Sequence, residues 1–259
     1  MNPAASMALI LGALGLMLCG VRLLQSAAGV GSETGRKLVH MGMGVIALAL
    51  PWLFSDAGPV WLLAALATAA LLAVRFIPAV TRHLGGVLGG VQRFSLGEVY
   101  FAPGVALAFT LAGGDRAEFC GAVGVLTFAD SAGALVGTRW GRRRYHALGH
   151  AKSAEGSAAV FAASVLCVAV ASTVLGGESW TVALTGALLA GVVVTVVEGL
   201  ASHGLDNLLL PPVVVGLMRL WDGRSAESSS LIFACVTGPV AGLVIWFAAV
   251  PRRRKSAGG

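Results

Sequence analysis

The sequence predicts an all-α, polytopic integral membrane protein that forms one domain with about nine transmembrane helices. Of its 259 residues, 57% are apolar and only 12% are charged, and the mean hydropathy is +0.85. A water-soluble protein of this size could not cover its surface with so few polar residues. Apolar runs of about 15–22 residues, near the length that crosses a bilayer, follow one another and leave no room for a separate soluble domain.

The order of the apolar runs also predicts an orientation. With the N-terminus outside and the C-terminus inside, all of the 18 Lys and Arg residues fall on the inner side except Arg116, Arg219 and Arg224. This distribution follows the positive-inside rule. We therefore expect one membrane domain over 1–251 and a short basic cytoplasmic tail over 252–259. The nine predicted spans are 3–24, 38–54, 59–77, 99–113, 119–138, 157–175, 180–198, 207–221 and 229–250.

Three further expectations concern the ends and connections of these spans. The first span should be retained, because its basic residues follow the apolar run instead of preceding it as in a signal peptide. Residues 78–97 place apolar side chains at helical spacing and predict an interfacial helix on the inner leaflet, although four glycines weaken it. The four cysteines are isolated in apolar runs and predict neither a disulfide nor a zinc site.

The second span begins with a basic motif. Arg36 and Lys37 could bind phosphate groups, since a guanidinium binds them in a bidentate manner and an ammonium acts as a point charge. His40 lies one turn further along a similar helix face. Spacing alone favours the alternative, in which the two cations anchor the span and the histidine is structural.

The fifth span contains the most informative acid. Asp130 lies nine residues before Arg139, so on a helix it is about 13 Å from the loop, and a carboxylate at that depth must be paired, metal-bound or solvated. Gly133, Gly137 and Gly141 follow at spacings of four. They either allow close helix packing or let a nucleotide approach the backbone.

A basic loop and a helix start follow. Arg142, the two arginines after it and Lys152 could bind a triphosphate, Ser153 could cap the next helix, and Glu155 could offer a carboxylate to a metal. The alternative is a capped helix start whose charges suit the helix dipole.

The remaining acids also lie on the inner side. Glu198 ends a span, where a carboxylate opposes the helix dipole and no base is near in sequence, so we expect a bound cation beside it. Asp206 and Asn207 stand before an apolar stretch and serve either as helix caps or as part of a metal and nucleotide site. Glu98 either begins a helix favourably or belongs to the same site.

These motifs, in this order, resemble those of the CTP-dependent polyprenol kinases, which include phytol kinase, dolichol kinase and the CTP-dependent diacylglycerol kinase. The motifs are R-K-x-x-H at 36–40, G-E-x-Y-F-x-x-G at 97–104, D-x-x-x-x-x-x-G-x-x-x-G at 130–141, K-S-x-E-G-S at 152–157, V-E-x-L at 197–200 and L-D-N at 205–207. The resemblance implies transfer of the CTP γ-phosphate to an isoprenoid alcohol at the cytoplasmic face, with Mg²⁺ as cofactor.

The resemblance and the residue chemistry together assign expected roles. The catalytic residues are Asp130, Lys152 and Glu98. The metal ligands are Asp130, Glu198 and Asp206. The nucleotide-binding residues are Arg36, Lys37, His40, Gly133, Gly137, Gly141, Arg142, Glu155 and Asn207. The partners are CTP, a membrane lipid alcohol and the bilayer, in the cytoplasmic membrane of a prokaryote.

Other functions are less well supported by the sequence. Ala129 and Ala134 stand where the phytol-kinase form often has a glycine and a second acid, which favours the dolichol and diacylglycerol kinases. A phosphatidate cytidylyltransferase should carry a K-R-x-x-x-x-K-D signature, which is absent. A small transporter should have polar residues in the middle of several spans, and few occur. The basic residues do not gather on one amphipathic face, so no nucleic-acid partner is expected.

Overall fold

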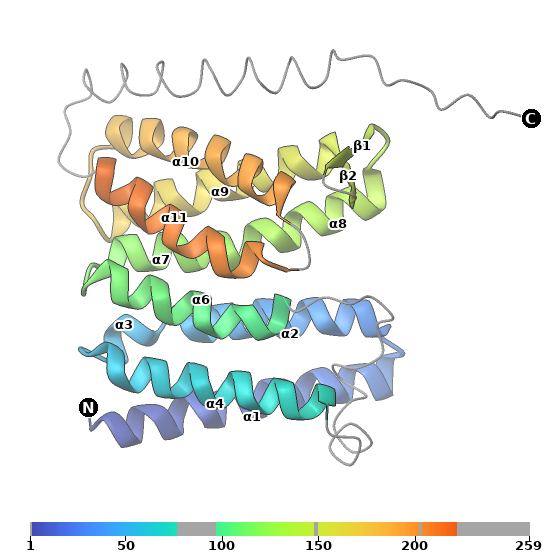
Figure 1. The fold of residues 1–259 in the computed structure, drawn as a ribbon, viewed down its shortest axis with the longest axis vertical. Coiled ribbons are helices and arrows are strands. Elements are labelled where there is room, and N and C mark those ends of the chain that lie inside the picture. The colour runs from blue at the N-terminus through green and yellow to red at the C-terminus, as the bar shows by residue number, and fades with distance from the viewer. Residues whose placement is uncertain (1, 77–96, 148–149, 202–203, 222–259) are drawn as a thin grey trace, which may run out of the picture.

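The computed structural model describes residues 2–76, 97–147, 150–201 and 204–221, which form a bundle of long helices with one β-hairpin at its end (Figure 1). The predicted ninth span, the interfacial helix over 78–96 and the basic tail lie outside the described residues. The elements are α1 (Pro3–Ala28), α2 (Ser32–Ala47), α3 (Leu50–Leu53), α4 (Ala57–Phe76), α6 (Gly97–Ala112), α7 (Arg116–Gly124), the π-helix η1 (Val125–Ala129), α8 (Asp130–Trp140), β1 (Arg144–Ala147), β2 (His150–Ser153), α9 (Ala154–Val174), α10 (Trp180–Leu200) and α11 (Asp206–Trp221).

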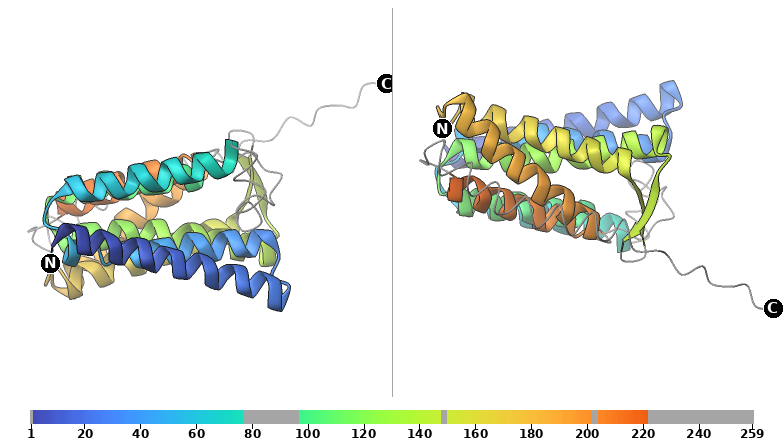
Figure 2. Two further views of the ribbon diagram at one scale, coloured as in Figure 1. Left: turned by 90° about the horizontal axis from the view of Figure 1, so that it is seen from below. Right: turned by 90° about the horizontal axis from the view of Figure 1, so that it is seen from above.

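The helices form two layers (Figure 2). One layer contains α4, α6 and α11, and the other contains α1, α2, the continuous run α7–η1–α8, and α9, while α10 packs against both α9 and α11. The run α7–η1–α8 passes through the centre, and η1 contacts helices of both layers. Val125, Leu126, Thr127 and Ala129 of η1 are fully buried, so the core is centred on the π-helical segment.

Each of the eight predicted spans that fall within the described residues contains helix. Among these helices, four are long and apolar enough to cross a membrane: α1, the run Arg116–Trp140, α9 and α10. Two more, Ala57–Ala73 and Gly97–Ala112, are apolar but shorter. The all-helical membrane architecture is therefore supported, whereas the count of nine and the orientation stay predictions.

The second predicted span, 38–54, is interrupted. Helix α2 ends at Ala47, and the four-residue α3 begins at Leu50 with Pro51 in its first turn. Proline has no backbone N–H and its ring crowds the preceding turn, so it suits a helix start and not a helix interior.

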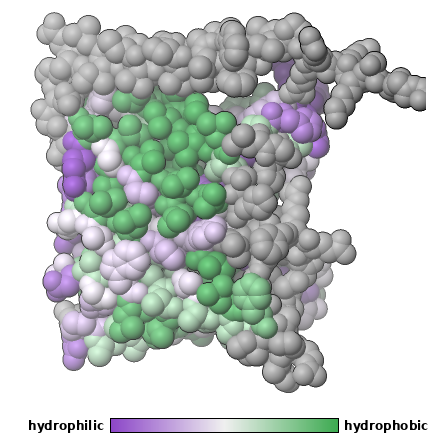
Figure 3. Space-filling model, in the orientation of Figure 1, coloured by the Kyte–Doolittle hydropathy of each residue, from purple (hydrophilic) through white to green (hydrophobic). Residues whose placement is uncertain are grey.

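The outer surface of the bundle is apolar. Leu16, Leu23, Leu166 and Val174 are all strongly exposed, and apolar side chains cover the middle of the face in Figure 3, with hydrophilic ones at its left edge and beside the hairpin. Exposed apolar area on this scale marks a surface that meets another apolar phase. A lipid environment meets that requirement.

Helix α11 is attached to α6 near both of its ends. At one end the Asn207 side-chain amide donates to the Gly97 carbonyl (2.8 Å). At the other end Arg219 donates to the Leu111 carbonyl (2.7 Å) and forms an ion pair with Glu118 of α7 (2.7 Å). The two helices are therefore held together by polar contacts as well as by packing.

The β-hairpin was not predicted. Strands β1 and β2 pair antiparallel, with Tyr145 opposite Lys152, and the Tyr145 hydroxyl lies 2.7 Å from the Ser157 hydroxyl on α9. The Glu155 carboxylate accepts hydrogen bonds from the backbone N–H groups of Arg142 and Arg143. The loop expected to bind a triphosphate is thus an ordered hairpin that Glu155 fixes at its base.

Candidate functional site

Most of the predicted site residues gather at one end of the bundle, on the right in Figure 1, which we call the charged end. The N-terminal turns of α2, α6, α9 and α11, the C-terminus of α10 and the hairpin meet there. The predicted site residues on these elements include Arg36, Lys37, Glu98, Asp130, Lys152, Glu198, Asp206 and Asn207.

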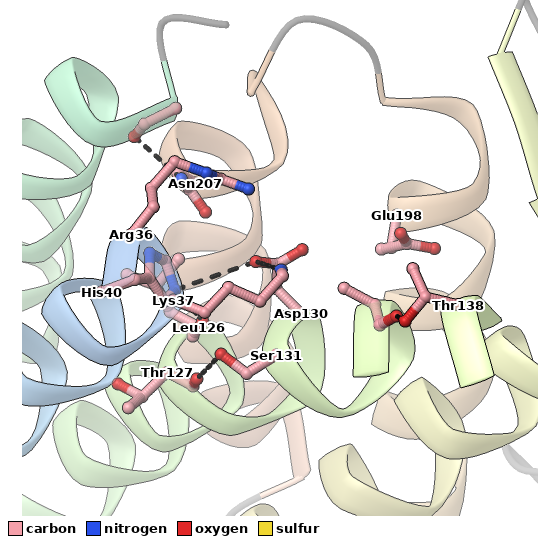
Figure 4. Close-up of polar contacts among 12 residues, drawn as sticks. Arg36, Lys37, His40, Leu126, Thr127, Asp130, Ser131, Thr138, Glu198 and Asn207 are labelled. Carbon is pink, nitrogen blue, oxygen red and sulfur yellow. Dashed lines mark hydrogen bonds and ion pairs between the residues drawn. The ribbon is translucent and has the colours of Figure 1, made fainter. Parts of the chain in front are cut away.

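Asp130 has partners on α2. Its Oδ2 atom lies 4.0 Å from Lys37 Nζ and 4.0 Å from His40 Nε2. Figure 4 shows the carboxylate between these side chains and Glu198. Arg139, nine residues along the chain, instead stacks on the Trp140 ring. An intramembrane acid was expected to need a partner, and the structure supplies a cationic one, Lys37, and the His40 ring from another helix.

Two further ion pairs join elements at the charged end. Arg36 and Glu98 are 3.6 Å apart and connect α2 to the first turn of α6. Lys152 Nζ lies 2.6 Å from Glu198 Oε1 and also donates to the Glu198 backbone carbonyl. At the C-terminus of α10, where a bound cation was expected, the partner of Glu198 is therefore the Lys152 ammonium. A phosphate group or a metal ion that used these side chains would have to replace this contact.

Asp206 stands at the start of α11, before the apolar stretch that begins at Leu208. Burial, together with the nearby carboxylates of Asp130 and Glu198, raises the pKa of Asp206 to about 6. Nearby negative charges disfavour ionisation of a buried acid. A bound cation would therefore stabilise the ionised form of Asp206.

Asn207 has an unsatisfied acceptor. Its Nδ2 donates to Gly97, but within the described ranges its buried Oδ1 has no hydrogen-bond partner. A buried carbonyl oxygen without a partner costs free energy. A donor from a ligand would satisfy it.

The three predicted metal ligands do not form a compact cluster. Across the described part of the chain, no group of three or more His, Cys, Asp or Glu side chains is close enough to hold one ion. Carboxylate oxygens are nevertheless the donors that Mg²⁺ prefers, and this ion commonly uses only one or two of them together with substrate phosphates and water. The donor chemistry at Asp130, Glu198 and Asp206 fits Mg²⁺ in that mode.

The glycines of α8 pack against α9. A Cβ atom on Gly133 would lie 2.5 Å from Val160 Cγ2, one on Gly137 would lie 3.1 Å from Ser153 Oγ, and Gly141 would meet the Gly137 carbonyl. These close neighbours match helix packing, one of the two interpretations of these residues. Their part in nucleotide binding stays a prediction.

Other predicted nucleotide-binding residues also have contacts within the protein. His40 is buried, donates from Nε2 to the Leu126 carbonyl (3.1 Å) and packs edge-on against Phe101. Glu155 is bonded to the hairpin backbone, and only Arg142 presents an exposed side chain. Neither the π-helical segment nor Phe101 was predicted, because neither stands out from the apolar run that contains it.

These features together define a class: an α-helical membrane protein whose charged end combines phosphate-compatible cations with magnesium-compatible acids. The chain is 32% identical over 207 residues to the phytol kinase of Synechocystis sp., a match that covers 76% of this chain and 83% of that protein. The chain therefore belongs to the CTP-dependent polyprenol kinase family. No family model matches the sequence, and no solved structure matches it.

The comparison also bears on the position of the chain within the family. Ala129 and Ala134 had favoured the dolichol and diacylglycerol kinases, whereas the relative found is a phytol kinase. The motif and the relative point to different acceptor alcohols, so the acceptor stays a prediction.

Proposed function

We propose that this protein is a membrane kinase that transfers the γ-phosphoryl group of CTP to the hydroxyl of an isoprenoid alcohol, at the cytoplasmic face of a prokaryotic membrane. The observation that carries the proposal is the similarity to a phytol kinase over 76% of the chain. The arrangement of charges at one end of the bundle supports it. Phytol is the first acceptor to test.

The reaction requires positioning and charge neutralisation more than covalent catalysis. The alcohol oxygen attacks the γ-phosphorus, the bond to the β-phosphate oxygen breaks, CDP leaves, and the hydroxyl proton passes to a base. Arg36 and Lys37 are the cations for the phosphates. Asp130 and Glu98 are the two candidates for the base.

Lys152 would serve the same reaction after exchanging partners. In the structure its ammonium is bound to Glu198, and in the proposed complex it contacts a phosphate oxygen. Glu198, Asp206 and Asp130 are the residues that would hold Mg²⁺, which when bound neutralises charge on the triphosphate. The Asn207 Oδ1 atom, which lacks a partner within the described residues, is available to a donor on the nucleotide.

The decisive experiment uses the purified protein in lipid nanodiscs. CTP labelled either at the γ- or at the α-phosphate is incubated with Mg²⁺ and with phytol, polyprenols, dolichol or diacylglycerol. The proposal expects the γ-label in the lipid product, the α-label in CDP, and a preference for CTP over ATP at equal concentration. In a parallel reaction with phosphatidate as acceptor, transfer of the α-label to lipid with release of pyrophosphate would indicate a cytidylyltransferase. Absence of transfer to every isoprenoid alcohol would refute the proposal.

A further inference from the structure

The segment just before Asp130 has an unusual backbone. Residues Val125–Ala129 are π-helical, between the α-helical segments α7 and α8. A π-turn contains an extra residue compared with an α-turn and is rare outside functional sites. One residue of an α-helix corresponds to a rotation of about 100°, so this turn determines which way the first residue of α8 faces. That residue is Asp130.

His40 of α2 binds directly to this segment. Its Nε2 atom lies 3.1 Å from the carbonyl oxygen of Leu126, the second residue of η1. The ring is buried, with only 4% of the residue exposed, and the edge of the ring system meets Phe101 of α6 at a centroid distance of 5.0 Å. Because a carbonyl can only accept, this contact requires the proton on Nε2.

Gly44, one turn after His40 on the same face of α2, brings that helix onto η1. A Cβ atom at Gly44 would overlap the hydroxyl of Thr127 and lie 2.6 Å from its Cβ. The Thr127 hydroxyl itself donates to the Val123 carbonyl (2.6 Å), and the Ser131 hydroxyl donates to the Thr127 carbonyl (3.0 Å). Side chains therefore satisfy backbone groups on both sides of the π-turn, and α2 covers it.

We propose that His40 is a positioning residue: its hydrogen bond to the Leu126 carbonyl holds η1 in the π-helical form and so directs the Asp130 carboxylate toward Lys37 and the charged end. This inference deepens the proposed function and rests on it where catalysis is concerned. It replaces the expectation that His40 contacts the nucleotide. The charged groups that face the ring are Asp130 at 4.0 Å and, one turn earlier on α2, Lys37 and Arg36.

Two matched variants separate this role from nucleotide binding. In His40→Gln the side-chain amide can reach the position of Nε2, whereas in His40→Asn it is one carbon too short. We expect His40→Gln to keep kcat within about tenfold of the natural protein. We expect His40→Asn to lose about 100-fold in kcat, the scale of a misplacement of about 1 Å, while KM for CTP stays within threefold. Val45→Leu, an exposed site on α2, is the control and should change neither constant.

A spectroscopic measurement on the natural protein tests the hydrogen bond itself. Selective ¹⁵N labelling of the five histidines, with His40→Gln used only for assignment, should show His40 protonated at Nε2 by NMR. An unprotonated Nε2, equal kcat losses for the two variants, or a rise in KM with kcat retained would each overturn the inference. If the natural protein transfers no phosphate, the proposed function fails, but the NMR measurement still decides whether His40 holds η1.

Discussion

Replacing Gly133 by alanine tests whether the glycines of α8 serve helix packing or nucleotide binding. The new methyl group would lie 2.5 Å from Val160 Cγ2 and 3.4 Å from the Gly156 carbonyl oxygen. Val160 is 1% exposed, and a helical valine has essentially one side-chain rotamer, so it cannot turn away. Overpacking of this kind costs about 1–3 kcal/mol, which for a protein of this size lowers Tm by roughly 2–12 °C.

A second substitution should relieve the overlap. In Gly133→Ala/Val160→Ala the offending methyl group is gone, and the nearest remaining atom of residue 160 is Cβ at 3.9 Å, an ordinary contact. Val160→Ala alone leaves a void and costs about 2 kcal/mol. The added methyl group of the double variant fills part of that void. We therefore expect the double variant to be at least as stable as Val160→Ala, a coupling of about 2 kcal/mol between two sites in contact.

The assay is thermal unfolding in nanodiscs at a fixed scan rate, with KM for CTP measured on the same preparations. Packing predicts that Gly133→Ala lowers Tm in the natural protein but does not lower it further in Val160→Ala, and that KM is unchanged in the folded fraction. An unchanged Tm with a raised KM that Val160→Ala leaves in place would refute the packing argument and return Gly133 to the nucleotide site.

Three other predictions concern the charged end and the orientation. Asp130→Asn should abolish transfer while Tm stays within a few degrees, because asparagine keeps the size of the side chain and is less costly than aspartate inside a bilayer. Retained activity would contradict the catalytic role of Asp130. Lys152→Met should lower Tm, because it leaves the Glu198 carboxylate without its cation. Adding Glu198→Gln should restore most of the lost Tm but not the activity. Thermal unfolding of the single and double variants checks this, and additive losses of Tm would contradict the pairing. In a cysteine-free background, a cysteine at Ser55 should react with an impermeant maleimide from outside the cell and one at His146 only from inside, and the reverse pattern would overturn the predicted orientation.

The helices could be predicted because the signal for each is long and local. A run of apolar residues long enough to cross a bilayer identifies a helix in lipid without any knowledge of its neighbours. The interruptions were missed because each depends on few residues. Pro51 lies inside an apolar run and was read as part of the span, and η1 contains only apolar residues and Thr127, so the shift of one residue in helical period leaves no pattern in the sequence.

The site could be predicted only in its composition. The sequence identified the acids and bases at the inner ends of the spans, but their pairing depends on contacts between distant positions. Lys152 and Glu198 are 46 residues apart, and the sequence predicted a phosphate contact for Lys152 and a metal ion for Glu198. The dipole argument at Glu198 predicted a bound cation, because it needs only the helix end. In the structure the positive charge beside Glu198 is instead the Lys152 ammonium, on a hairpin that was not predicted.

The double attachment of α11 to α6 constrains how a lipid substrate reaches the charged end. Asn207 and Arg219 are twelve residues apart, about 18 Å along the helix, and each holds α11 to α6 by hydrogen bonds. To part these two helices, a prenyl chain would have to break both attachments as well as the packing between them. We therefore expect α6 and α11 to move together, and a lipid alcohol that enters from the membrane to pass between other helices of the bundle.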